Sequence, residues 1–245
     1  MYFIEHYSSS KGNFYEIVAN NHNRILLDPG VTWQMAEKAL NYDLSNIVGC
    51  MVTHSHSDHC RCVRDVQKAG IKIYGSTGTL NVLDLEPNHK VYCINSKKKG
   101  WFSLWPDNTF RVMPCIANHD AKDPLFFVIK CDNEYLLFAP DTAFIKQRFN
   151  LQFSIIAIEC SFDIKVLQAR VRANDINETL AKRLLSAHME KSVAMKYISK
   201  YCDLSKCREI HLLHMSGDNI DAELVQKEFE QKFFITTIVC GLKET

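Results

Sequence analysis

The chain has 245 residues, of which 47% are hydrophobic and 23% charged, values that are ordinary for a globular protein of one large or two small domains. The 29 Lys and Arg residues nearly balance the 28 Asp and Glu residues, so the net charge is +1. That balance excludes a strongly basic chain that grips nucleic acid by charge alone, although it leaves room for a local basic patch. We assign residues 1–245 to a single domain.

The sequence shows no membrane or export signal. No run of 18 apolar residues occurs, and the first six residues lack the basic start and apolar stretch of a secretory signal. The ten cysteines are scattered without a Cys-x-x-Cys pair, which disfavours a cysteine-based zinc site. These features predict a cytoplasmic protein with reduced thiols and no membrane partner.

The pattern of apolar residues predicts many strands and a few helices. Strands are expected at 14–18, 24–27, 47–52, 71–74, 110–113, 125–129, 135–139, 154–158, 209–213 and 234–239. Helices are expected at 32–40, 61–69, 176–185, 191–201 and 221–232. The elements fall into two similar halves. That arrangement favours an α+β fold in which two β-sheets pack face to face with helices outside.

One short segment carries most of the chemical signal. Directly after an apolar strand, residues 53–59 read Thr-His-Ser-His-Ser-Asp-His. His54 and His56 are two positions apart and can point to the same side, whereas Asp58 and His59 follow where they can face a second position. Imidazole and carboxylate groups suit divalent ions such as Zn²⁺ or Mn²⁺. Four potential ligands so close together disfavour the alternative, a solvated polar loop with accidental histidines.

This His-x-His-x-Asp-His pattern resembles the metallo-β-lactamase fold superfamily, and other marks of that family follow in the same order. His119, Asp141 and His214 each come after a predicted strand, and Asp141 lies in Pro-Asp-Thr. Upstream, Asp28 lies in Leu-Asp-Pro-Gly, which resembles the family's Asp-x-Gly motif. The resemblance implies an αββα sandwich, two packed β-sheets with helices outside.

The resemblance also implies a pair of adjacent divalent cations, Zn²⁺ or Mn²⁺. Asp28 would orient the metal-binding loop from behind. Clustered carboxylates and imidazoles are hard to bury without partners, which disfavours a structural role for the whole set. The family pattern gives each cation three ligands of its own and one shared ligand: His54, His56 and His119 for the first, Asp58, His59 and His214 for the second, and Asp141 for both.

Further segments resemble the small YycJ/WalJ-like members of the superfamily, which are related to tRNase Z and are regarded as DNA exonucleases. The carboxylate at Asp141, where several true metallo-β-lactamases have Cys, disfavours antibiotic hydrolysis. Ala187 and Met189-Glu190 depart from the branch, which has Gly and Leu-Ser at these positions. The segments that match are 8–13, which contains Ser-Lys-Gly-Asn, 158–163, 187–189 and 214–219.

In the phosphodiesterase branch, a histidine at the position of His188 is expected to protonate the leaving oxygen. Glu159 would orient that imidazole and keep it protonated. The implied nucleophile is a hydroxide shared by the two cations and held by Asp58 or Asp141. The plainer alternative for His188 is a surface histidine at the start of a helix.

The length leaves no room for the large β-CASP insertion of other nucleases in the superfamily, and no long tRNA-clamping arm is visible. Substrate contacts are instead expected within 96–108, where Lys97 and Lys98 could meet phosphates and Trp101 could stack on a base. A solvated turn followed by aromatic packing is the more ordinary interpretation of that segment.

The function expected first is a metal-dependent phosphodiesterase, either a nuclease or a cyclic-nucleotide hydrolase, that acts on a nucleotide or nucleic-acid phosphodiester. The resemblance also allows a homodimer. A second hypothesis is a metallohydrolase of a lactone, thioester or lactam, which would not need the acid pair of His188 and Glu159. A third is a non-catalytic metal-binding scaffold, which the intact ligand set disfavours.

Overall fold

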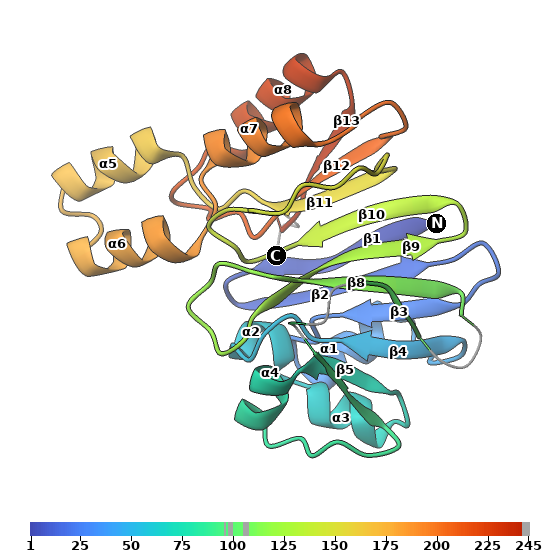
Figure 1. The fold of residues 1–245 in the computed structure, drawn as a ribbon. Coiled ribbons are helices and arrows are strands. Elements are labelled where there is room, and N and C mark those ends of the chain that lie inside the picture. Colours follow the sequence, from blue (N-terminus) through green and yellow to red (C-terminus); the bar gives the residue numbers. More distant parts are fainter. Residues whose placement is uncertain (96, 98–99, 105–107, 242–245) are drawn as a thin grey trace. The chain divides into compact units, whose positions relative to one another are not determined.

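The computed structural model describes residues 1–95, 97, 100–104 and 108–241 (Figure 1). The chain divides into two compact units. Unit 1 comprises Met1–Ile116 and Ala121–Glu134, and unit 2 comprises Ala117–Asp120 and Tyr135–Thr245. The assignment of the whole chain to one domain stays a prediction. Within the described ranges, no helix is long and apolar enough to cross a membrane.

Unit 1 is built on a six-stranded sheet of the described residues, in the order β1-β2-β3-β4-β5-β6. β2 pairs antiparallel with both β1 and β3, and β3 to β6 run parallel. The strands are β1 (Tyr2–Ser9), β2 (Gly12–Val18), β3 (Arg24–Leu27), β4 (Ile47–Met51), β5 (Ile73–Ser76) and β6 (Val91–Ile94).

Among its described residues, unit 1 also has four short helices and three more strands. The helices are α1 (Trp33–Ala39), α2 (Ser57–Cys60), α3 (Val63–Lys68) and α4 (Thr77–Val82). The strands, which pair antiparallel, are β7 (Phe102–Ser103), β8 (Phe110–Ile116) and β9 (Leu125–Cys131).

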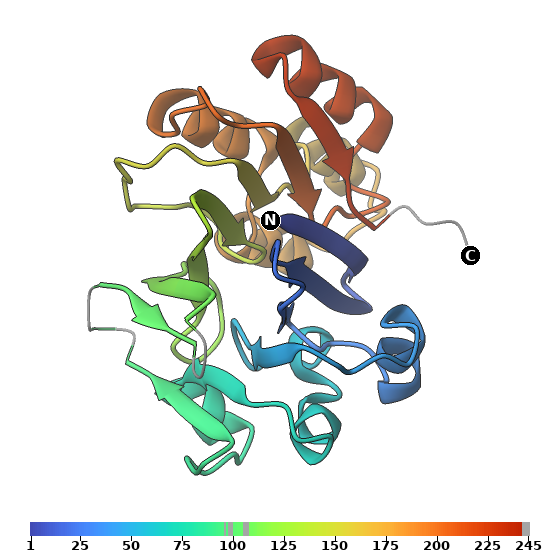
Figure 2. The ribbon, with the colours of Figure 1, turned by 90° about the vertical axis from the view of Figure 1, so that its right-hand side faces the viewer.

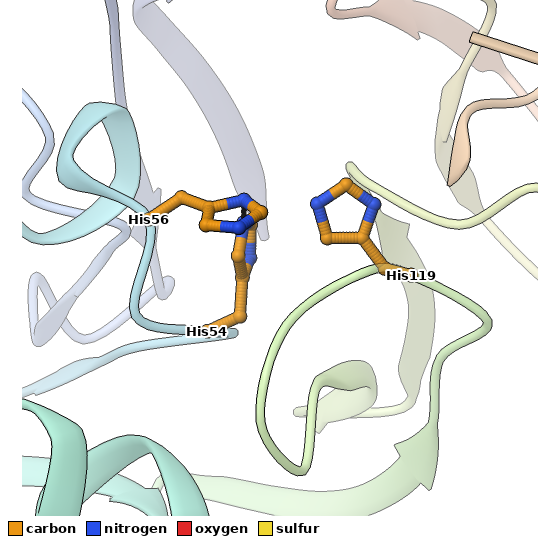
Figure 3. A group of neighbouring side chains, drawn as sticks. All are labelled: His54, His56 and His119. Carbon is orange, nitrogen blue, oxygen red and sulfur yellow. Dashed lines mark hydrogen bonds between the residues drawn. The ribbon is translucent and has the colours of Figure 1, made fainter. Parts of the chain in front are cut away.

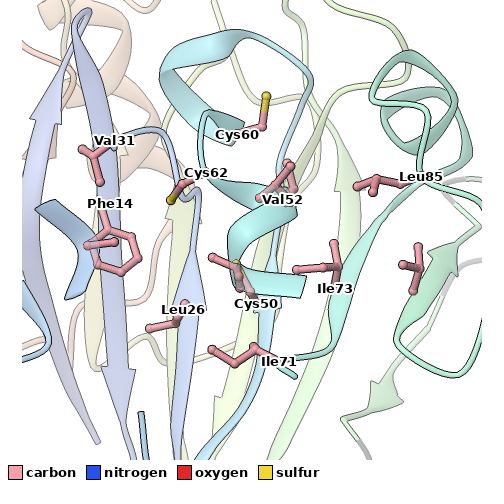
Figure 4. Close-up of a cluster of buried hydrophobic side chains, with 14 of the residues drawn as sticks. Phe14, Leu26, Val31, Cys50, Val52, Cys60, Cys62, Ile71, Ile73 and Leu85 are labelled. Carbon is pink, nitrogen blue, oxygen red and sulfur yellow. The ribbon is translucent and has the colours of Figure 1, made fainter. Parts of the chain in front are cut away.

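A cluster of buried side chains joins the sheet of unit 1 to its helices (Figure 4). Phe14 and Leu26 come from the sheet and are fully buried, and Val66 comes from α3. Cys50 and Cys62 belong to the same cluster, so these thiols act as small apolar side chains. All ten cysteines lie in the described part of the chain, and none of them forms a disulfide.

Unit 2 contains four parallel strands in the order β13-β12-β11-β10 and four helices (Figure 2). Every residue of β11 is buried, as expected for a strand inside a parallel sheet. The helix α8 packs on β13 and also contacts α7, whereas α5 and α6 pack against each other. The strands are β10 (Glu134–Ala139), β11 (Ile155–Glu159), β12 (Glu209–Leu213) and β13 (Thr236–Val239). The helices are α5 (Ile164–Arg172), α6 (Glu178–Ala187), α7 (Lys191–Tyr201) and α8 (Ala222–Phe233).

Most predicted elements are present, with ends that differ by a few residues. The expected helix over 61–69 is α3, which starts only at Val63, while residues 57–60 form the separate turn α2. The helix α5 was not predicted, although Ile164, Leu167 and Val171 are spaced three and four residues apart and pack in one cluster. The strands β6 and β7 and the helix α4 are too short to give a clear pattern.

A close backbone approach fixes how the segment after β3 packs on α2. A Cβ atom on Gly30 would lie 1.7 Å from the carbonyl oxygen of Asp58, so only glycine fits there. We expect Gly30→Ala to lower the free energy of unfolding by about 1–3 kcal/mol, since the backbone must move apart. Urea unfolding followed by circular dichroism measures this loss.

The matched control is Gly217→Ala, because a Cβ atom there would meet nothing within 4 Å. This change should alter the free energy of unfolding by less than about 0.5 kcal/mol. Equal unfolding curves for the two variants would contradict the packing that we describe at Gly30.

Candidate metal centre

In unit 1, a buried carboxylate organises the segment that follows β4. Asp28 follows β3, and because β3 and β4 run parallel, it lies beside the carboxyl end of β4. The backbone N–H of Thr53 donates to Asp28 Oδ1 at 2.8 Å, and the Thr53 hydroxyl donates to Oδ2 at 2.8 Å. Burial raises the pKa of Asp28, whereas the charge and hydrogen bond of His59 and the Thr53 donors oppose that rise.

These contacts fix the tautomers of two histidines. His59 Nδ1 lies 2.9 Å from Asp28 Oδ2 and donates to that carboxylate, so the lone pair of its ring is on Nε2. The Thr53 hydroxyl donates its proton to Asp28, so it accepts from His54 Nδ1 at 3.0 Å. The lone pair of the His54 ring is therefore also on Nε2. Both imidazoles therefore present an Nε2 that can bind a cation.

The other two predicted ligands of unit 1 lie in the same segment. His54 Nε2 and His56 Nδ1 are 3.1 Å apart (Figure 3). Asp58 is in the first turn of α2 and its carboxylate lies 3.5 Å from His59 Nε2. The structure thus brings together the four predicted ligands of unit 1, and this set of imidazole nitrogens and a carboxylate fits a divalent cation.

In unit 2, His119 follows β8 and is labelled in Figure 3. Its Nδ1 donates to the carbonyl oxygen of Ala187 at 2.8 Å, so Nε2 carries the lone pair. Burial lowers the pKa of His119, which favours the neutral imidazole that a cation requires. Asp120 accepts from Arg183 of α6 at 2.7 Å and ties the His119 segment to the same helix that ends at Ala187.

Three adjacent parallel strands supply the rest of the predicted site in unit 2. Asp141 comes just after β10, Glu159 ends β11, and His214 follows β12. His119 Nε2 lies 3.5 Å from Asp141 Oδ2, and His214 Nε2 lies 3.9 Å from Asp141 Oδ1. Because the carboxyl ends of neighbouring parallel strands meet at one edge of the sheet, these groups converge there.

His188 completes this group from the junction of α6 and α7. Its Nδ1 lies 2.6 Å from Glu159 Oε1, and its ring stacks on that of His214 with centroids 5.2 Å apart. Glu159 is fully buried and accepts from the backbone N–H of Thr142 at 2.7 Å. Burial, and next the charge of Asp141, raise the pKa of Glu159 well above its ordinary value.

The two departures from the branch pattern near His188 have structural explanations. Ala187 is the last residue of α6, where its carbonyl orients His119. Glu190 is the N-cap of α7, and its carboxylate accepts from the backbone N–H groups of Ser192 and Val193. It thereby does the capping that the expected serine would do.

The proposed substrate contacts have less structural support. Lys97 is exposed, and the guanidinium of Arg111 lies 5.9 Å from the ring centroid of Trp101. Trp101 lines a cavity of about 530 Å³ together with Tyr74 and Phe102. Lys98 lies outside the described residues. The side chain of Asn13, which contacts both Asp58 and His59, was not singled out from the sequence, although it ends the Ser-Lys-Gly-Asn segment.

Comparison with known proteins identifies the family. A family model described as a β-lactamase superfamily domain matches residues 23–199, well over half of the chain. The chain belongs to the β-lactamase superfamily. The predicted resemblance and the predicted fold class, two packed β-sheets with helices, are confirmed. Membership in this superfamily points to a metal-dependent hydrolase, and the donor sets of both units are consistent with divalent metal binding.

Individual proteins match most of the chain. The exodeoxyribonuclease YycJ of Bacillus anthracis is 25% identical over 237 residues, which cover 91% of this chain and 86% of that protein. The metallo-β-lactamase fold protein YhfI from Bacillus subtilis has a TM-score of 0.73 at 15% identity and covers 98% of this chain and 96% of its own. Human tRNase Z, short form, has a TM-score of 0.54 at 15% identity, with coverage of 88% and 93%.

Asp28→Asn tests whether the buried carboxylate prepares the ligands of unit 1. The amide keeps the size of the side chain, but its NH₂ group cannot accept a hydrogen bond from Thr53 or His59. The His59 imidazole therefore loses its fixed orientation. We expect the affinity for Zn²⁺ to fall by about 10–100-fold, as measured by competition with a chelator.

Asp43→Asn is the control, since the Asp43 side chain is 60% exposed and pairs with Arg24 at 3.6 Å. This variant should bind Zn²⁺ as the unchanged protein does. An Asp28→Asn protein with undiminished affinity would show that Asp28 does not act on the metal ligands.

Proposed function

We propose that this chain is a dinuclear metal-dependent phosphodiesterase that cleaves nucleic-acid phosphodiesters. In this proposal the ligands are those that the family pattern assigns, with Asp141 shared between the two cations and Zn²⁺ or Mn²⁺ as the metal. A cytoplasmic location and a homodimer stay predictions from the sequence. The assigned ligands are His54, His56 and His119 for one cation and Asp58, His59 and His214 for the other.

The observation that carries the proposal is the pair of His188 and Glu159. Hydrolysis of a phosphodiester expels an alkoxide, which is a poor leaving group unless it is protonated. The short contact of 2.6 Å between His188 Nδ1 and Glu159 Oε1 holds the imidazole in one orientation. Nε2 is then the ring nitrogen that can deliver a proton. Hydrolysis of a thioester makes less use of such a residue, because a thiolate leaves readily without a proton.

The protein's own groups prepare this proton transfer. The backbone N–H of Thr142 fixes Glu159 from the side opposite His188. Full burial of Glu159 makes its isolated anion costly, which favours a protonated partner beside it. Two divalent cations, when bound, supply charge to stabilise the phosphoryl oxygens and lower the pKa of water to near neutrality. Asp58 or Asp141 would orient the attacking water.

The preference for nucleic acid is supported by the match to a protein named exodeoxyribonuclease, at 25% identity over 237 residues. The net charge of +1 supplies no general attraction for a long polyanion, so local contacts must hold the substrate. Lys97, Lys98 and Trp101 are our proposed contacts, because cations meet phosphates and an indole stacks on a base.

One feature of unit 2 favours a second role for His188. Single ligand atoms of Asp141, Glu159, His188 and His214 all lie within 4.8 Å of one another, so this set could itself hold a cation. His188 would then be a metal ligand and not a general acid. The two roles differ in what the loss of His188 does to the metal content.

Hydrolysis of bis(p-nitrophenyl) phosphate by protein reloaded with Mn²⁺ or Zn²⁺ tests the proposed function. We expect turnover of this compound to require the metal. Its p-nitrophenolate leaves readily without a proton, so the general acid is tested on a dinucleotide, whose leaving group is an alkoxide. Cleavage of the dinucleotide should fall by about 10²–10⁴-fold in His188→Ala, the usual contribution of a general acid. His89→Ala, a change at an exposed histidine, should leave turnover unchanged. Absence of turnover with two metals bound would refute the proposal and direct the search to lactones and thioesters.

The metal content of His188→Ala separates the two roles of this histidine. A general acid can be removed without loss of metal, so we expect two metal ions per chain by elemental analysis in both His188→Ala and the unchanged protein. One ion per chain in the variant would make His188 a ligand.

The substrate preference is measured separately, by comparing the kcat/KM values of the unchanged protein for single-stranded DNA, double-stranded DNA and cyclic nucleotides.

A further inference from the structure

A chain of buried hydrogen bonds lies behind Asp58 and His59 and takes no part in the mechanism above. It runs through Ser8 of β1 and through Tyr15 and Asn13 of β2, and all three side chains are almost completely buried. We propose that Asn13 is a positioning residue that fixes the Asp58 carboxylate for metal binding and orients the His59 imidazole before a cation binds. This inference rests on the ligand roles in the proposed function.

The amide nitrogen of Asn13 reaches both groups. Asn13 Nδ2 lies 3.0 Å from His59 Nε2 and 3.4 Å from Asp58 Oδ2. It also lies 3.1 Å from the backbone carbonyl oxygen of Asp58 and 3.0 Å from that of Ser9. One side chain therefore cross-links the end of β1 to the first turn of α2.

The orientation of this amide is determined by its surroundings. The two carbonyl oxygens near Nδ2 can only accept, so the nitrogen must face them. On the other side, the Tyr15 hydroxyl donates to Asn13 Oδ1 at 3.0 Å. Because the proton of the Tyr15 hydroxyl is already donated to Asn13, the Tyr15 oxygen accepts from the Ser8 hydroxyl at 2.8 Å. The chain of donors runs in one direction, from Ser8 to Asn13, and ends at the metal-binding segment.

The number of donors and acceptors shows why this arrangement is compatible with a bound cation. The amide nitrogen has two protons, and four acceptors lie within 3.5 Å of it. If His59 gives the lone pair of Nε2 to a cation, three oxygen acceptors remain for the two protons. Asn13 can thus hold the Asp58 segment both before and after a cation binds.

Asn13 and Asp28 hold His59 from its two ring nitrogens. The Asp28 carboxylate accepts from His59 Nδ1, and the amide nitrogen of Asn13 contacts His59 Nε2. The backbone carbonyl of Asn13 also accepts from the N–H of Gly30 at 2.8 Å, which ties the turn to the segment that carries Asp28. Two buried side chains from different strands thus restrict the same imidazole, and Asn13 alone also contacts the Asp58 carboxylate.

The test is the affinity of the metal-free 245-residue chain for Zn²⁺ and Mn²⁺, measured by competition with a chelator in Asn13→Ala, Tyr15→Phe and a control. The control is Thr237→Val, which removes a hydroxyl that is also fully buried but lies in β13 and donates to Ile235. We expect Asn13→Ala to lose about 10–100-fold in affinity, as other residues that orient metal ligands do. Tyr15→Phe should lose less, because it only frees the amide to rotate, and Thr237→Val should lose none.

Thermal unfolding of the metal-free variants supplies the readout of a purely structural role. If Asn13→Ala lowers Tm no more than Thr237→Val does and yet binds metal more weakly, the inference is supported. If Asn13→Ala loses stability but keeps the metal affinity of the unchanged protein, Asn13 is only a structural residue. Should Asn13→Ala fail to fold, undiminished affinity in Tyr15→Phe would overturn the inference.

The outcome for the proposed function can be read separately. Normal metal binding by the unchanged protein without any phosphodiester cleavage refutes the phosphodiesterase and leaves the role of Asn13 intact. An unchanged protein that binds no divalent cation refutes the ligand assignment itself, and the role of Asn13 falls with it. Steady-state kinetics adds a further check, since a positioning residue should lower kcat more than it raises KM.

Discussion

The arrangement of the ligands in unit 1 depends on a carboxylate that has no access to water. Asp28 is fully buried, and an ionised carboxylate in such a place is stable only when donors surround it. Thr53 and His59 supply those donors, and in doing so they lose their own freedom to rotate. The cost of burying one charge is thus what fixes the tautomer of His59 and, through the Thr53 hydroxyl, that of His54.

Unit 2 reaches a similar result by a different construction. Its chemical groups stand at the ends of three neighbouring parallel strands, so the sheet register sets their spacing. The backbone at His214 has a positive φ of 54°, a conformation that costs energy for a residue with a side chain and that is typical of functional sites. Glu159 then does for His188 what Asp28 does for His59, because each buried carboxylate orients one imidazole.

Most strands, and the position of the clustered His and Asp residues directly after a strand, could be predicted from the sequence, because both depend on local patterns. An apolar strand followed by clustered His and Asp residues can be recognised without a structure, and His54 to His59 are an instance. The contacts of Asn13 could not be predicted, since 45 positions separate it from Asp58 and only the fold brings the two side chains together. The same holds for the carbonyl of Ala187 that orients His119, which no side-chain pattern reveals. The helix α5 could have been predicted, since Ile164, Leu167 and Val171 have helical spacing.

The central claim is that two cations share Asp141 while His188 stays free of metal to act as an acid. Anomalous diffraction from crystals grown with Mn²⁺ tests it most directly, because it places each ion among its ligands. We predict two peaks, one at His54, His56 and His119 and one at Asp58, His59 and His214, with the Asp141 carboxylate bound to both ions and the His188 ring to neither. A single peak held by Asp141, Glu159, His188 and His214 would contradict this account.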